Sequence, residues 1–303
     1  MSRLLRIRRR LLHECRDLLE LVLLPGLAAV LPWPLCFRVF RRLAHWRWLY
    51  RDVCEQAVRQ ARACGVVDDE AHWHWMRRLV TLVDHADFYL SHLRGRARAR
   101  RWLARRVCEE GAWPPPDRAA ILCTFHWGAG LWGLHGAARA GLHAHMLVTR
   151  PAAQAFQGRA VRAWYVRLRI QEITRVLGYE TLDVSAPLRQ VIRALRAGQQ
   201  IVAVVDVPAD QVAASEPVTV MNMPARIPRG LLRLAVDRGV PVTVYLSGFD
   251  VRTGRHQVRI KPLGVYDDLQ VLIGDVFRHL DEALAQEPAA WHFWSEARRF
   301  FVA

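Results

Sequence analysis

The stretch Ile201-Val-Ala-Val-Val-Asp206 decides the fold of this chain of 303 residues. Its five consecutive apolar residues, mostly β-branched, predict a strand that is buried on both faces, as in a parallel sheet. The preceding segment Leu188–Arg196 has helical spacing and ends just before Gly198, which suits a helix C-cap. A helix followed at once by a buried strand is typical of βα units, so this stretch indicates an α/β sheet.

The same alternation extends in both directions from this strand. Upstream, the segment Trp113-Pro-Pro-Pro-Asp117 breaks the chain, and Ala119–Thr124 then predicts a second buried strand. Other helices are expected over 127–140, 155–176, 230–238 and 269–286, and other strands over 144–148, 218–220 and 241–246. We therefore predict a mixed central sheet with helices on both faces, built as one integrated unit from residues 113–303.

Residues 1–112 are predicted to form a helical region that associates with a membrane. Arginines alternate with leucines at the start, and Leu21–Phe37 is the longest uncharged stretch. This stretch is at the lower length limit of a spanning helix and contains three prolines, so we favour shallow insertion beside an anionic leaflet. A helix buried in the core is the alternative, and a signal peptide has little support because no A-x-A-like site follows. Residues 38–110 have helical spacing throughout.

Composition narrows the functional classes. The net charge is +16, and almost all of the positive charge is arginine, because Lys261 is the single lysine. Such a chain suits nucleic acid, anionic lipid or an acidic carrier protein, but no nucleic-acid motif is present. The seven arginines within Arg94–Arg106 suggest contact with phosphate or carboxylate groups. The six scattered cysteines lack a C-x-x-C pair, which argues against a zinc site and favours reduced thiols in the cytoplasm.

Aromatic residues gather in the helical region before the proline break. Tryptophan and histidine recur beside arginine, and we interpret the pattern as helices that pack their apolar faces and leave charged tips in solvent. A binding role for these side chains is the alternative. The residues are Trp46, Trp48, His72, Trp73, His74 and Trp75.

The segment Thr124–Gly130 carries the sharpest chemical signal. A histidine, His126, follows the apolar strand at its carboxyl end, where ligands bind in open α/β sheets. Its imidazole has the pKa range of a general base near neutral pH. Gly128 and Gly130 would let a substrate approach the backbone, and amides at a helix start can hold an oxyanion. The alternative is a purely structural histidine.

Two more residues are candidates for the same site. Asp206 ends the strand that begins at Ile201, and it would share a sheet edge with His126 if the two strands are parallel. There it could orient an imidazole or hold an arginine; a turn or N-cap aspartate is the alternative. Arg175, which precedes Gly178, taken alone is one arginine in a basic helix.

In their order and spacing these segments resemble the late acyltransferases of lipid A assembly, the lauroyl/myristoyl acyltransferase family. The resemblance covers roughly residues 18–302 and implies a glycerolphosphate-acyltransferase-like fold. It rests on LLPGLAAVLPWPLCFRVFRRLA (23–44), Ile121–His126, Arg175 with Gly178, Ile192–Asp206, Val218–Val244 and Trp294–Phe300.

The family signature is H-x4-D/E, a base histidine with a carboxylate five positions later. His126 matches the histidine, but the acid position is occupied by Leu131. Three outcomes are open. Another acid replaces it, with Asp206, Glu216 or Glu296 as candidates; the base acts unaided at a reduced rate; or the chain is a divergent or inactive member with a different acceptor.

The resemblance implies transfer of a fatty acyl group from acyl carrier protein or acyl-CoA to a hydroxyl of a lipid or lipid-like acceptor, with no metal or cofactor. His126 would be the base, backbone amides near Gly128 would hold the oxyanion, and tryptophans such as Trp127 would line the acyl groove. Family members also use the positions of Arg175 and Asp206. The expected location is the cytoplasmic face of a bacterial inner membrane. The alternatives are a non-catalytic acyl-lipid binding or scaffold protein and a specialised metabolite as acceptor.

Overall fold

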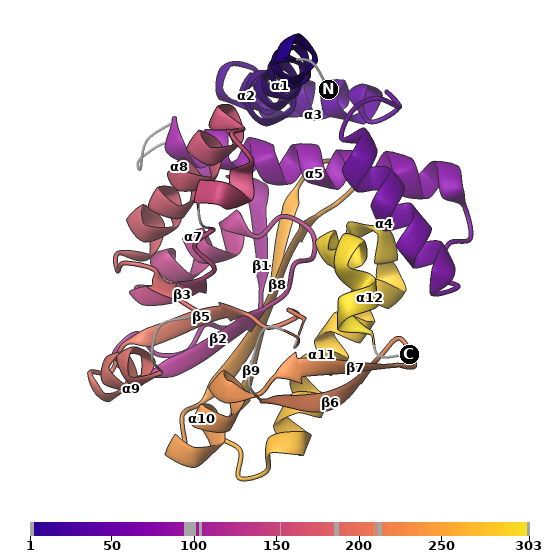
Figure 1. Ribbon diagram of the computed structural model, residues 1–303. Coiled ribbons are helices and arrows are strands. Elements are labelled where there is room, and N and C mark those ends of the chain that lie inside the picture. The colour runs from indigo at the N-terminus through magenta and orange to yellow at the C-terminus, as the bar shows by residue number, and fades with distance from the viewer. Residues whose placement is uncertain are drawn as a thin grey trace.

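A mixed seven-stranded sheet forms the centre of the computed structural model, and a two-stranded antiparallel hairpin lies outside it (Figure 1). The structure describes residues 3–93, 101–102, 105–151, 153–184, 188–208, 210 and 214–301. In spatial order the sheet contains β1 (Val107–Glu110), β9 (His256–Gly264), β8 (Val242–Phe249), β2 (Ala120–Thr124), β5 (Gln200–Val204), β3 (Ala144–Val148) and β4 (Leu182–Asp183). The hairpin pairs β6 (Ser215–Val220) with β7 (Met223–Pro228).

Helices cover both faces of the sheet, as predicted. Along β2, Ala120 and Leu122 pack with buried residues of α7 and α8, whereas Ile121 and Cys123 pack with α9, α10 and α11. This separation follows from the two-residue period of a strand. These helices are α7 (Leu131–Arg139), α8 (Ala160–Leu177), α9 (Arg189–Arg196), α10 (Gly230–Arg238) and α11 (Leu269–Gln286). The short α12 (Ala297–Phe300) follows near the C-terminus.

The helices of the N-terminal region stack above one end of the sheet (Figure 1). They are α1 (Arg3–Asp17), a π-helical segment (Leu18–Leu23), α2 (Leu24–Val30), α3 (Trp33–Leu43), α4 (Arg51–Ala63) and α5 (Glu70–His92). Helix α5 crosses the end of the sheet below α1 and α2. Helix α3 contacts this end directly, because Trp33 Nε1 donates to Gly254 O at 2.7 Å and Phe37 packs against Phe249 of β8. None of the helices among the described residues is both long and apolar enough to cross a membrane.

The apolar stretch 21–37 is divided between the core and the surface. Trp33 and Phe37 on α3 are buried, which agrees in part with the alternative of a core helix. Leu23 and Val30, in contrast, are more than half exposed. The prolines explain the division, because the helix stops at Leu31 and α3 starts with Pro32 as its N-cap.

Several predicted boundaries need correction. Residues 107–110 form strand β1, although helical spacing was expected there, because this segment pairs in parallel with β9. The helix expected from 127 starts at Leu131, since residues 127–130 form the loop after β2. Strands β7 and β9 were not predicted at all. In the Arg94–Arg106 run, Arg94, Arg96, Arg98 and Arg100 lie outside the described residues.

The turn that ends β1 gives a test of this edge of the sheet. Gly111 has φ +98°, and a Cβ there would lie 1.9 Å from the carbonyl oxygen of Ile260. We expect Gly111→Ala to lower the free energy of unfolding by about 1–3 kcal/mol or more. Gly230→Ala is the matched control, because that Cβ meets no atom within 4 Å and alanine favours the helix. Urea denaturation of both variants measures the difference, and equal stability would contradict the β1–β9 register.

Candidate functional site

His126 and Asp206 meet at the carboxyl edge of the sheet. Strands β2 and β5 are parallel with Thr124 opposite Val204, so the residues two positions further along leave the same edge side by side. His126 Nδ1 lies 2.9 Å from Asp206 Oδ1, and the backbone N–H of His126 donates to both carboxylate oxygens at 3.1 and 2.9 Å. Of the three candidate substitute acids, Asp206 is therefore the one that contacts the histidine.

The Asp206 carboxylate is wholly buried. Besides the two donors of His126, it accepts a hydrogen bond from Trp291 Nε1 at 2.6 Å. A buried carboxylate is stable only when such donors replace the lost water. These bonds fix the carboxylate against the end of β2.

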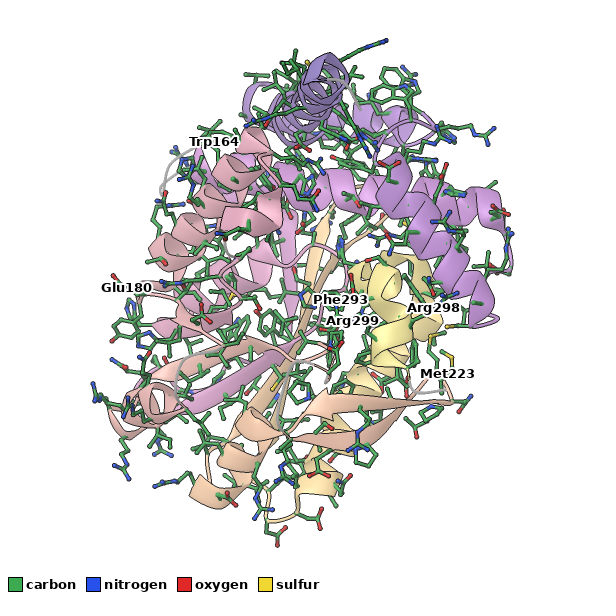
Figure 2. The ribbon with its side chains drawn as sticks, viewed as in Figure 1. Trp164, Glu180, Met223, Phe293, Arg298 and Arg299 are labelled. Carbon is green, nitrogen blue, oxygen red and sulfur yellow. The ribbon has the colours of Figure 1, made fainter. Side chains whose placement is uncertain are left out.

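The imidazole of His126 is held in a defined orientation but remains accessible. Its side chain is 32% exposed. Phe293 stacks on the ring with centroids 4.0 Å apart, and Figure 2 shows Phe293 between the sheet and the C-terminal helix. Because Nδ1 faces an acceptor-only carboxylate, the neutral ring carries its proton on Nδ1. Nε2 then keeps a lone pair, and it makes no hydrogen bond with the residues that the structure describes.

The loop after His126 differs from the expectation in one respect. The amide of Gly128 donates to Ala290 O at 3.1 Å and that of Ala129 to Ser247 O at 2.9 Å, so neither is free for an oxyanion. Gly128 is required there because its φ is +70° and a Cβ would lie 2.4 Å from Ser247 O. If backbone amides near Gly128 hold an oxyanion, as predicted, they are therefore not the amides of Gly128 and Ala129 in this conformation.

Trp127 and Gly130 lie at the two ends of this loop. Gly130 has open space where a Cβ would be and is the N-cap of α7, which has no side-chain cap. Trp127 Nε1 donates to Glu287 O at 3.1 Å, and the guanidinium of Arg259 lies 5.8 Å from its ring centroid. The indole thus attaches the loop to the C-terminal segment.

The remaining candidates lie in other clusters. Arg175 is held by Glu172 with a 2.8 Å bond from Nε, and it also donates to Ser91 O. Glu216 pairs with Arg229 and Gln270, and Glu296 pairs with Arg299. The described contacts bring none of the three to His126.

The position five residues after His126 lies in the apolar core. Leu131 is 4% exposed and belongs to the buried cluster that includes Leu122, Leu134 and Tyr245. A carboxylate here would lack hydrogen-bond donors, so its burial would be costly. The carboxylate that contacts His126 is instead that of Asp206, two residues after the neighbouring strand β5.

Sequence reasoning missed the segment Trp291–Phe293 and its support from α5. Arg77 is buried, and it donates to Ala289 O at 2.9 Å and to Trp291 O at 3.1 Å. Its Nη2 lies 3.3 Å from His292 Nδ1, while His292 Nε2 donates to Gly128 O at 2.7 Å. The aromatic residues Trp291, Phe293 and Trp294, close together in the sequence, were the signal that could have pointed to this segment.

Comparison with protein-family models and with curated proteins finds no relative of this chain. No protein-family model matches the chain, and no curated protein matches it significantly. Within the described ranges, no three His, Cys, Asp or Glu residues are grouped so that they could hold a metal ion.

The partly buried His292 predicts a pH dependence of stability. Burial, followed by the charge of Arg77, lowers its pKa to about 3. Below about pH 6.5 the unfolded chain takes up a proton that the folded His292 does not, so stability falls as the pH decreases toward 3, by about 1.4 kcal/mol per unit. His292→Gln, which keeps both hydrogen-bonding roles, should remove this share of the slope in urea titrations between pH 6.5 and 4.5. An unchanged slope would contradict the prediction.

Proposed function

We propose that this chain is an acyltransferase that moves a fatty acyl group from an acyl carrier protein or acyl-CoA thioester to a hydroxyl of a lipid-like acceptor. One observation carries the proposal, namely the 2.9 Å bond between His126 Nδ1 and Asp206 at the carboxyl edge of the sheet. A partly exposed imidazole oriented by a buried carboxylate has the arrangement of a general base.

In the proposed reaction, His126 Nε2 removes the proton from the acceptor hydroxyl as the oxygen attacks the thioester carbonyl. Asp206 stabilises the imidazolium that forms. The tetrahedral intermediate then expels the thiolate, which takes the proton back from Nε2, and an ester and a free thiol result. Since Gly128 and Ala129 use their amides elsewhere, the oxyanion is assigned to the uncapped first turn of α7.

We propose that the chain belongs to the lauroyl/myristoyl acyltransferase family and has its glycerolphosphate-acyltransferase-like fold. The order of the segments supports it, from the N-terminal apolar stretch through His126 to the Trp-rich end. This member would differ in its acid, because Asp206 on β5 takes the role of the residue five positions after the histidine. The replacement favours an active enzyme over a scaffold.

We further propose that the N-terminal helices rest on the cytoplasmic face of an inner membrane. Exposed apolar side chains gather on them next to the exposed Arg8, Arg9 and Arg10. The mixture of apolar and basic side chains suits shallow insertion into an anionic leaflet. The exposed apolar residues are Ile7, Leu11, Leu12, Leu18, Leu23, Val30 and Leu35.

The base and its acid are tested together by acyl transfer from a labelled acyl carrier protein thioester to a membrane lipid extract. His126→Ala should lower the rate at least about a hundredfold. Asp206→Asn should lower it by a similar factor, because a neutral amide does not stabilise the imidazolium and its NH2 can donate to Nδ1, which favours the wrong tautomer. Glu216→Gln and Glu296→Gln are matched controls that should keep full activity.

Two results would contradict this assignment. Full activity of the folded His126→Ala protein would exclude the base. Wild-type protein that binds the thioester but forms no acylated product with any lipid or metabolite acceptor would favour the binding or scaffold alternative.

Membrane association is tested by flotation with anionic vesicles. The double variant Leu11→Ser, Leu12→Ser should lower the partition coefficient about tenfold or more, since two leucine side chains lose their apolar burial. Val271→Ser, on the exposed face of α11, is the matched control. Equal binding of the two variants would show that α1 does not contact the bilayer.

A further inference from the structure

A separate cavity of about 800 Å³ lies between the turn after α3, α4 and α5. Neither His126 nor Asp206 lines it. Its walls combine arginine with tryptophan, including Arg47, Arg51, Arg78, Trp48 and Trp75. Such a combination of guanidinium groups and aromatic walls is suited to an anion that is attached to a less polar body.

The carboxylates of this cavity are already paired. Glu55 accepts from Arg51 Nε at 2.8 Å, and Glu70 pairs with Arg62 and lies 3.6 Å from His74 Nε2. Both therefore have a cationic partner at hand. The charge of Glu55 also acts on Arg78 and His74, where it opposes the effect of Arg47, but Glu55 forms its ion pair with Arg51.

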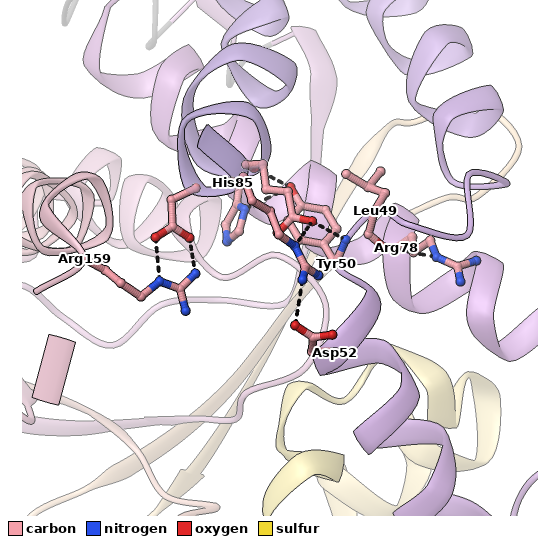
Figure 3. A network of polar contacts seen from close by, with 9 residues as sticks. Leu49, Tyr50, Asp52, Arg78, His85 and Arg159 are labelled. Atoms are coloured by element: carbon pink, nitrogen blue, oxygen red, sulfur yellow. Dashed lines mark hydrogen bonds and ion pairs between the residues drawn. The ribbon is translucent and has the colours of Figure 1, made fainter. Parts of the chain in front are cut away.

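Two arginines of this cavity, Arg47 and Arg78, have no carboxylate paired with them among the described residues. Arg78 is 5% exposed, and it donates to the carbonyl oxygens of Leu49 at 3.2 Å and Ala44 at 3.4 Å; Figure 3 shows the bond to Leu49. Carbonyl groups orient a guanidinium but carry no net charge. Neither Arg78 nor Arg47 forms an ion pair with the residues that the structure describes.

The fields of these two arginines overlap inside the cavity. Burial, followed by the charge of Arg78, lowers the pKa of His74, and Arg47 contributes in the same direction. Burial also lowers the pKa of Arg78, and Arg47 adds to that shift. Arg78 is buried and Arg47 is exposed in the same cavity, so a bound anion would relieve the repulsion between the two and the desolvation of Arg78.

We propose that this cavity binds a phosphate monoester through Arg47 and Arg78. A monoester dianion matches the two guanidinium groups, and Trp48 and Trp75 would pack against the body that carries it. Trp46 and Trp48 contact each other and are nearly half exposed beside the cavity. The carrier is either a lipid headgroup or a soluble phosphate compound. The site does not rest on the proposed acyl transfer.

The experiment measures binding of the full chain to two phosphate probes. Inorganic phosphate is titrated by calorimetry, and phosphatidic acid is presented in phosphatidylcholine vesicles. Arg47→Ala should weaken phosphate binding about tenfold or more, because a charge-assisted contact is lost. Arg238→Ala, an exposed arginine at the end of α10, and His126→Ala should both bind as the wild type does.

The outcomes separate the sources. Binding of both probes, with loss in Arg47→Ala, supports a soluble phosphate compound; binding of phosphatidic acid alone, with the same loss, supports a lipid headgroup. Arg78→Lys, checked by thermal unfolding, should also weaken binding, because the fork geometry is lost. Absence of binding to both probes, or equal weakening by Arg47→Ala and Arg238→Ala, would overturn the proposal.

Discussion

The buried carboxylate of Asp206 is the constraint on which the site depends. It collects donors from three separate parts of the chain, since it leaves β5, binds the backbone and ring of His126 after β2, and receives the indole of Trp291 near the C-terminus. Removing it would leave these buried donors without an acceptor, which costs more than the bonds themselves contribute. The same carboxylate thus orients the imidazole of His126 and holds the C-terminal segment through Trp291.

Helix α5 carries this arrangement to the N-terminal region. Arg77 on its inner side holds the carbonyls before and at Trp291. Further along α5, His85 Nδ1 lies 3.2 Å from the hydroxyl of Tyr50 (Figure 3). The backbone N–H and the hydroxyl of Tyr50 both donate hydrogen bonds to Glu20. Helix α5 therefore connects the end of the sheet to the N-terminal helices, so the proposed membrane contact and the site are supported by the same helix.

The sequence was sufficient for local features and insufficient for pairings across the fold. The runs Ala119–Thr124 and Ile201–Val205 were recognisable as strands because a strand covered on both faces is apolar along its length. The contact between His126 and Asp206 is predictable if these strands are parallel, because both residues then leave the same edge of the sheet. Trp291 and His292 could not, because their roles depend on how a distant segment crosses the loop at Gly128. Strand β1 escaped notice for a related reason: its pairing with β9 overrides a local pattern that looked helical.

The parallel pairing of β1 with β9 has a consequence for how this chain can be divided. The proline-rich break at Trp113 looks like a natural place to cut, yet β1 lies before it and covers one side of β9. A fragment that begins after the break would present the unprotected backbone of β9 along the outermost strand. Bare strand edges of this kind recruit other chains, so such a fragment would be prone to self-association rather than to independent folding.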